Sequence, residues 1–193
     1  MKTLTHLTLT ALLLVSAPGA QAAMPACDGP VATSERAALG LSITTASPAA
    51  RALVEAGLGA YWAGDSAAAL QAFRLAQSAD PNCAMCHWGE ALALGPRVHS
   101  PMQHARVRPA WEAIIRAQSL ARDASAAERD LIDATRHRYG VNPMVLRGQL
   151  DHAWATVVRQ LAEDRPDSAA LWLLLREAEA ILELGPDAAA AGG

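Results

Sequence analysis

The sequence predicts an all-α protein of about seven helices, arranged as a row of helical hairpins. Alanine, the strongest helix former, supplies 45 of the 193 residues, and β-branched residues are few outside residues 1–22. Capping residues, glycines and prolines divide the rest of the chain into segments of helical length. Because the turns between these segments are short, consecutive helices are expected to pack as antiparallel neighbours.

Each expected helix opens at a capping residue or a proline and closes at a turn signal. Ser47-Pro48 places a capping side chain before a proline, and Ser125 with Glu128 has the spacing of a capping box. Asn142-Pro143 is expected to open the sixth helix, and Gly185-Pro186 to end the seventh. The expected helices cover residues 47–63, 66–79, 83–94, 105–122, 125–139, 142–164 and 168–184.

The first 22 residues have the three parts of a secretory signal. Lys2 precedes an apolar stretch over residues 7–17, and Ala20-Gln21-Ala22 is a small-residue cleavage site before Ala23. We therefore expect a periplasmic or secreted protein. The expected parts of the chain are a signal peptide (1–22), an extended N-terminal arm (23–46), a helical repeat domain (47–185) and a flexible tail (186–193).

Charge and hydropathy exclude several classes of partner. The formal net charge is −3 for the whole chain, and Lys2 is the one lysine among its 16 basic residues. Neither nucleic acid nor an anionic membrane surface is expected to bind such a chain. After residue 22 no apolar run reaches the length of a membrane-spanning helix, so we expect no membrane span. The sequence shows no phosphate-binding glycine loop and no nucleophilic triad, and we expect no enzyme.

A 34-residue register begins at Ala50. In that register the small residue of the first helix is Gly57, the turn is Gly64-Asp65, and the second helix carries Ala69, Phe73, Ala76 and Pro81. This stretch resembles a tetratricopeptide (TPR) repeat, in which small residues allow close helix packing and the aromatic ring fills the hairpin. Residues 84–122 and 149–184 are TPR-like, with Trp154 where a small alanine is usual. The fold expected is a TPR-like helical-hairpin solenoid.

The run from Asp80 to Pro96, followed by Pro101-Met102, resembles a family of exported bacterial TPR proteins. The resemblance covers roughly residues 50–184. It implies a protein-interaction module and no enzymatic activity.

Cys83, Cys86 and His87 have the Cys-x-x-Cys-His spacing at which haem c is attached, with His87 as one axial ligand. Met102 is the expected second ligand, with His99 and His104 as alternatives. In an oxidising compartment the two cysteines can instead bridge each other, or one of them can pair with Cys27. Two further alternatives are a copper site that includes His87 and Met102, and free thiols at Cys83 and Cys86. The sequence therefore leaves two functions open: an interaction module stapled by its cysteines, and a c-type cytochrome.

The partner groove is expected on the concave face of the solenoid. In the TPR register that face is lined by an apolar, aromatic set of positions suited to a peptide or helix of a partner protein. The five tryptophans are expected to act mainly as packing wedges in an alanine-rich core. The expected groove residues are Arg51, Val54, Leu58, Tyr61, Met85, Trp88 and Leu92.

Overall fold

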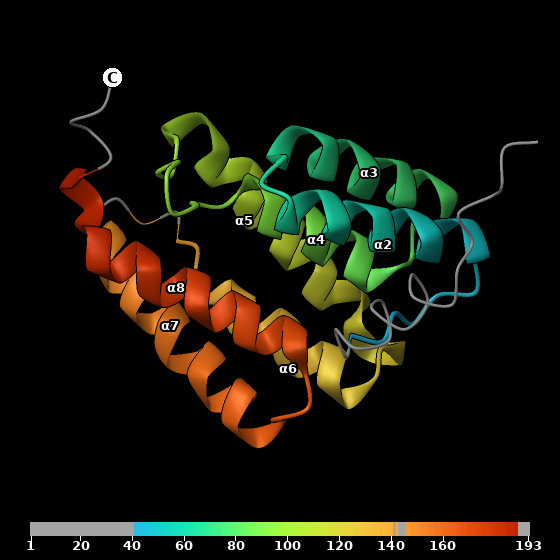
Figure 1. Ribbon diagram of the computed structural model, residues 1–193. Helices are drawn as coiled ribbons and strands as arrows, with labels where there is room; N and C mark the ends of the chain where they lie inside the picture. The colour runs from blue at the N-terminus through green and yellow to red at the C-terminus, as the bar shows by residue number, and fades with distance from the viewer. Residues whose placement is uncertain (1–40, 141, 143–145, 189–193) are drawn as a thin grey trace, which may run out of the picture.

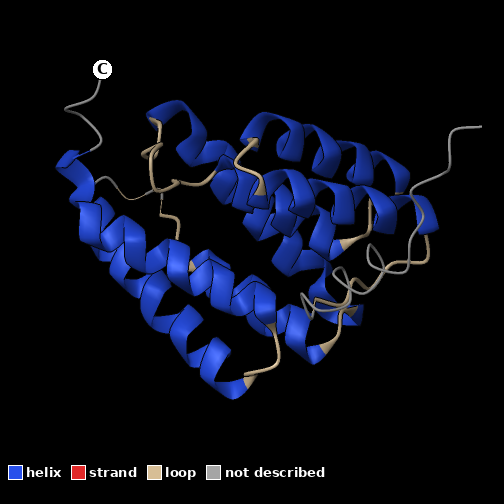
Figure 2. Ribbon diagram, viewed as in Figure 1, coloured by secondary structure: helices blue, strands red, loops and turns tan. Residues whose placement is uncertain are grey.

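A computed structural model describes residues 41–140, 142 and 146–188, with side chains described up to residue 185. Within these ranges the chain forms seven α-helices and one 3-10 helix, with no strand (Figure 2). The predicted all-α class is confirmed. Residues 1–22, predicted as a signal peptide, and residues 23–40 of the predicted arm lie outside the described ranges. No described helix combines the length and apolar character needed to cross a membrane.

Most observed helices begin and end near the capping residues, glycines and prolines that predicted them. Ser47 Oγ accepts a hydrogen bond from Ala50 N at 3.1 Å, and Ser125 and Glu128 form the predicted capping box at the start of the fifth helix. The elements are α2 (Pro48–Trp62), α3 (Ser66–Ala79), α4 (Ala84–Leu94), α5 (His104–Leu120), η1 (Ala121–Asp123), α6 (Ala126–Arg136), α7 (Arg147–Asp164) and α8 (Ala169–Ala188).

The helices pack mainly as sequential neighbours. The closest pairings are α2 with α3, α3 with α4, α4 with α5, and α7 with α8 (Figure 1). The helix α6 contacts both α4 and α7, so it joins the two ends of the stack. The arrangement is a set of helical hairpins, and the finer assignment to a TPR-like solenoid stays a prediction.

Phe73 is the centre of packing between α2, α3 and α4. Its ring is fully buried and lies against the backbone of Gly57 in α2 and Gly89 in α4. A Cβ atom added at Gly57 would lie 2.8 Å from Phe73 Cε1, and one at Gly89 would lie 2.2 Å from Phe73 Cδ1. The Phe73 ring therefore fills the hairpin of α2 and α3, as predicted, and the absence of a side chain at Gly57 and Gly89 makes room for it.

The last part of the predicted extended arm, residues 41–46, has no regular secondary structure and packs against the helices. Ile43 is buried, and both the backbone N–H and the hydroxyl of Thr44 donate to the buried carboxylate of Glu128, each at 2.5 Å. The physical reason is that Glu128 accepts hydrogen bonds from Thr44 and from Ser125 N at the same time. We call residues 41–46 the strap.

Three helix boundaries differ from the prediction. The predicted helix 105–122 is split into α5 and η1, and α6 ends at Arg136 because Arg138 and Tyr139 turn into the core. The helix α7 begins at Arg147, not at Asn142. There Arg147 pairs with Asp151 and donates to the Arg138 carbonyl oxygen at 2.8 Å, which fixes the start of α7 against the end of α6.

The predicted end of the last helix is confirmed at Gly185. This glycine has φ of 68°, a left-handed conformation that interrupts the regular helix at the predicted place. Residues 189–193 of the predicted tail lie outside the described ranges.

Candidate functional site: a buried disulfide and a buried tyrosine–arginine cluster

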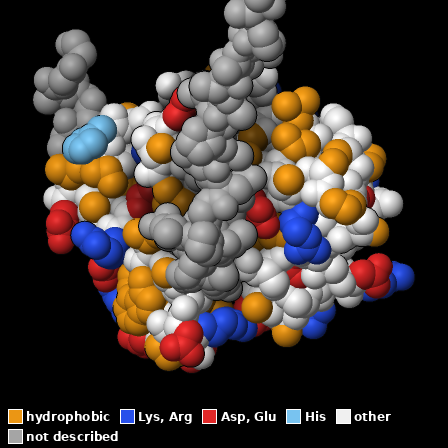
Figure 3. Space-filling model, turned by 45° about the vertical axis from the view of Figure 1, so that its right-hand side comes forward, with side chains coloured by type: hydrophobic (Ala, Val, Ile, Leu, Met, Phe, Trp, Pro, Cys, Tyr) orange, Lys and Arg blue, Asp and Glu red, His pale blue; other side chains and the backbone are white. Residues whose placement is uncertain are grey.

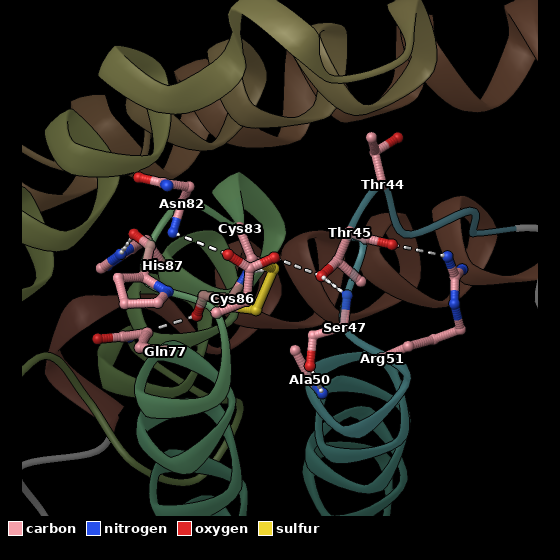
Figure 4. The surroundings of a disulfide bond; sticks show 12 residues. Thr44, Thr45, Ser47, Ala50, Arg51, Gln77, Asn82, Cys83, Cys86 and His87 are labelled. Carbon is pink, nitrogen blue, oxygen red and sulfur yellow. Dashed lines mark hydrogen bonds between the residues drawn. A yellow bond between two sulfur atoms is a disulfide. The ribbon is translucent and has the colours of Figure 1, made fainter.

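A disulfide bond joins Cys83 to Cys86 at the start of α4 (Figure 4). Cys83 is the N-cap residue of the helix, and its Sγ accepts a hydrogen bond from Cys86 N at 3.1 Å. The two Cα atoms are 5.3 Å apart, and both side chains are buried. The bridge therefore staples the first turn of α4 and caps it with the same sulfur atom.

The turn before α4 is held by Asp80. Its carboxylate accepts from Asn82 N at 3.0 Å, and its carbonyl oxygen accepts from Cys83 N at 3.2 Å. The other carboxylate oxygen of Asp80 accepts from the hydroxyl of Thr45 in the strap. In Figure 4 the disulfide lies on the side of α4 that faces α2, next to this strap contact. Both cysteines are buried beside this contact.

Of the cysteine pairings expected from the sequence, the structure contains the local bridge. Cys27 lies outside the described residues, and the sulfur atoms of Cys83 and Cys86 are bonded to each other. This arrangement also bears on haem, because haem c needs two separate thioether sulfurs with open space beside them.

The residues around the cysteines do not fit covalent haem in this fold. Cys83 and Cys86 are only 1% and 0% exposed. A hollow of about 300 Å³ borders the start of α4, but neither sulfur nor His87 lines it. Attachment of haem would require the disulfide to break and the first turn of α4 to open. Haem attachment is thus supported by the Cys-x-x-Cys-His pattern alone and stays a prediction.

His87 and Met102, the expected metal ligands, have other neighbours. The half-buried His87 ring has its Nε2 atom 3.4 Å from the Pro81 carbonyl oxygen, and Met102 packs against the edge of the core. Burial lowers the pKa of His87, and Arg116 lowers it further, against the opposing effects of Pro81 and Glu90. Among the described residues no group of three or more His, Cys, Asp and Glu side chains is placed to hold a metal ion.

The expected partner groove is not an open surface, and this prediction is wrong. Of its seven residues only Arg51 is exposed, and the other six are buried. The reason is that the C-terminal helices cover this face: Trp88 Nε1 donates to Thr135 in α6 at 2.8 Å, and the Tyr61 hydroxyl donates to Glu177 in α8. The buried residues of the expected groove are Val54, Leu58, Tyr61, Met85, Trp88 and Leu92.

The tryptophans divide between core and surface. Trp88 and Trp154 are fully buried, as expected of packing wedges, and Trp62 and Trp111 pack at the edge of the core. Trp172 is 40% exposed on α8, so for this residue the expectation is wrong.

A second buried group of functional side chains links α8 to the end of α2. We call Tyr61, Arg97, Arg138 and Glu177 the Tyr61 cluster. Glu177 accepts from the Tyr61 hydroxyl through Oε2 and forms an ion pair with Arg97 Nε through Oε1. The Arg97 guanidinium lies 3.8 Å from the centroid of the Tyr61 ring, and its Nη1 donates to the Tyr61 carbonyl oxygen at 2.8 Å.

Arg138 gives the Tyr61 cluster an excess of positive charge. It is fully buried, and it donates through Nη2 to the Pro96 carbonyl oxygen, whereas its Nε and Nη1 atoms have no hydrogen-bond partner. Burial acts to lower the pKa of Arg138, but the oxygens of Tyr61, Tyr139 and Glu177 outweigh that effect and the pKa is raised. The Glu177 carboxylate is thus ion-paired with Arg97, while the buried Arg138 guanidinium has no ion pair of its own among the described residues.

The protonation state of Tyr61 follows from the same surroundings. Burial raises the pKa of the Tyr61 phenol well above its ordinary value, and the Glu177 carboxylate raises it further, while Arg138 and Arg97 oppose the change. Tyr61 therefore stays protonated and donates its hydrogen bond at every physiological pH.

Sequence reasoning missed Arg97, Arg138 and Glu177. No spacing pattern links them, since Tyr61 and Glu177 are 116 residues apart. One local feature could have drawn attention to Arg138: it is followed by a tyrosine, Tyr139, near the end of the helix predicted over residues 125–139. The prediction placed both residues inside that helix.

On the face shown in Figure 3, acidic and basic side chains are interspersed with separate apolar patches. Comparisons with protein-family models, with curated protein sequences and with solved structures find no match.

Proposed function

We propose that the protein is an exported protein-interaction module, a set of TPR-like helical hairpins stapled by the Cys83–Cys86 disulfide. The observation that carries this proposal is the buried disulfide at the N-cap of α4, in the middle of a stack of helical hairpins. A bridge of this kind suits an oxidising compartment, in agreement with the leader-like residues 1–22. We assign the protein a binding role rather than a catalytic one.

The alternative function is a c-type cytochrome, and it rests on the order of Cys83, Cys86 and His87 alone. The two functions differ in the state of the cysteines. An interaction module carries a disulfide and no pigment, whereas a cytochrome carries two thioethers and a haem absorbance band that survives acid-acetone extraction.

In-cell photo-crosslinking tests the interaction function. A photoreactive amino acid replaces Leu75, Ile115 or Trp172, three apolar residues that are 38–49% exposed. The matched control places it at Arg74, whose exposed side chain is next to Leu75 in α3. We expect a discrete crosslinked protein from at least one apolar position and none from Arg74. Absence of any position-specific crosslink in the native host would contradict the proposal.

A further inference from the structure

The donors of the Tyr61 cluster are held in place without help from α8. Arg97 is fixed by the Tyr61 ring and carbonyl oxygen, and Arg138 by the Pro96 carbonyl oxygen. Arg138 also lies over the ring of Trp154 in α7, 5.3 Å from its centroid. Because none of these contacts involves Glu177, the donors keep their positions when its carboxylate is removed.

The chemistry of the cluster selects a carboxylate. One oxygen of Glu177 accepts from the Tyr61 hydroxyl, and the other forms an ion pair with Arg97 Nε without a hydrogen bond. A hydroxyl donor beside a guanidinium is a pairing that suits a planar, two-oxygen anion. The nearby Arg138 adds a second positive charge and carries N–H groups without partners. A neutral side chain in the place of Glu177 would leave the half-buried Arg97 without its ion pair, next to the buried charge of Arg138.

We propose that Tyr61, Arg97 and Arg138 form a carboxylate-binding site that Glu177 of α8 occupies, and that an acidic side chain of a partner protein is the ligand that replaces Glu177. The second half of this statement rests on the proposed interaction function. The contact lies at the edge of the core, with the Arg97 and Glu177 side chains 19% and 10% exposed. An incoming carboxylate makes the same contacts that Glu177 gives up, so the exchange conserves charge and hydrogen bonds.

Chemical rescue with acetate tests the site. In Glu177→Ala the carboxylate is removed and a space of similar size is left, so sodium acetate should raise the Tm of this variant more than sodium chloride at equal ionic strength. The wild type, whose site is filled, should show no difference between the two salts. The matched control is Glu179→Ala, which removes an exposed carboxylate of the same helix that pairs with Arg159.

The double variant Arg97→Ala/Glu177→Ala should lose the acetate-specific rise, because one of the two donors is absent. Equal effects of acetate and chloride on Glu177→Ala would overturn the site. If Glu177→Ala does not fold in chloride, refolding is followed by circular dichroism in both salts. Recovery of helical signal in acetate alone supports the site, and no recovery in either salt overturns it.

The partner half is tested with the crosslinking positions described above. In the Glu177→Ala background the crosslinked yield of an acidic partner should rise, and in Arg97→Ala it should fall below that of the wild type. Acetate rescue without any crosslinked protein keeps the carboxylate site and rejects the interaction function. If a protein is crosslinked with the same yield in the wild type and in both variants, the interaction function is supported and an acidic ligand at this site is rejected.

Discussion

Trp88 and Thr135 are joined by a buried hydrogen bond, in which the indole N–H of α4 donates to the hydroxyl oxygen of α6 at 2.8 Å. Both side chains are 0% exposed, and the Thr135 hydroxyl donates in turn to the Leu131 carbonyl oxygen at 2.8 Å. The bond is one of the few polar links between the N-terminal hairpins and the helix that covers them.

Replacing Thr135 with valine should leave the Trp88 N–H buried without an acceptor. We expect Thr135→Val to lower the free energy of unfolding by about 1–3 kcal/mol, measured by urea denaturation. The control Thr156→Val removes an exposed hydroxyl that bonds only to its own helix, and it should change stability by no more than about 0.5 kcal/mol. Equal effects of the two variants would show that the Trp88 bond contributes nothing.

Gly89→Ala should destabilise the protein, because the new methyl group would meet the Phe73 ring at 2.2 Å. Overpacking of this kind costs typically about 1–3 kcal/mol. Gly59→Ala is the control: the residue is exposed in α2 with no atom within 4 Å of the added methyl group, so alanine there should stabilise the helix by up to about 1 kcal/mol. Urea denaturation of both variants measures the difference, and a stabilising Gly89→Ala would reject the packing described around Phe73.

The disulfide should make only a modest contribution to stability. It closes a very short loop, so its loss should cost less than the typical ~2–4 kcal/mol. The variant Cys83→Ser/Cys86→Ala separates two effects, since serine keeps an N-cap acceptor for the residue 86 N–H while the bridge is removed. The variant Cys83→Ala/Cys86→Ala loses both and should be less stable by about 1 kcal/mol more.

Intact mass of the protein from its native compartment checks the cysteine chemistry directly. A mass lower by two hydrogens per bridge and an absence of pigment are the expected results. The cytochrome alternative would be correct if the mass were higher by one haem and the haem remained attached after denaturation and after acid-acetone extraction.

Stability should fall as the pH drops below the ordinary histidine pKa of 6.5, in part because of His87. Its pKa is lowered in the folded protein, chiefly by burial, so the unfolded chain binds the proton more readily and protonation favours unfolding. The Tm of the wild type should therefore decrease from neutral pH to about pH 5 more steeply than that of His87→Gln. His137→Gln, at an exposed histidine, should follow the wild type; a His87→Gln profile parallel to the wild type would contradict the assignment.

Local signals predicted the helices, and long-range contacts decided where those predictions failed. Ser47 and the Ser125–Glu128 box work through neighbours three residues away, so the sequence was sufficient to place them. The groove prediction used helical register, which tells which side of a hairpin a residue faces but not which later helix covers that side. Tyr61 became a core residue because Glu177, far along the chain, binds it.

The difference between local signals and long-range contacts also explains which residues of the candidate site were predicted. Cys83 and Cys86 are close in sequence, and their bridge was among the expected pairings. Arg138 was assigned to a helix it does not belong to, because its burial depends on Pro96 and Trp154, contacts that no local pattern encodes.

The strap carries a consequence for the order in which the chain acquires its structure during synthesis. Thr44 is bound to Glu128, 84 positions further along the chain, so this end of the strap has no partner until α6 has been synthesised. Chains are made from the N-terminus, and the earliest part of the described structure therefore waits for α6 before it can settle. Before that point the strap can already reach Asp80 through the Thr45 hydroxyl. Completion of α6 then supplies the Glu128 carboxylate that holds Thr44 in place.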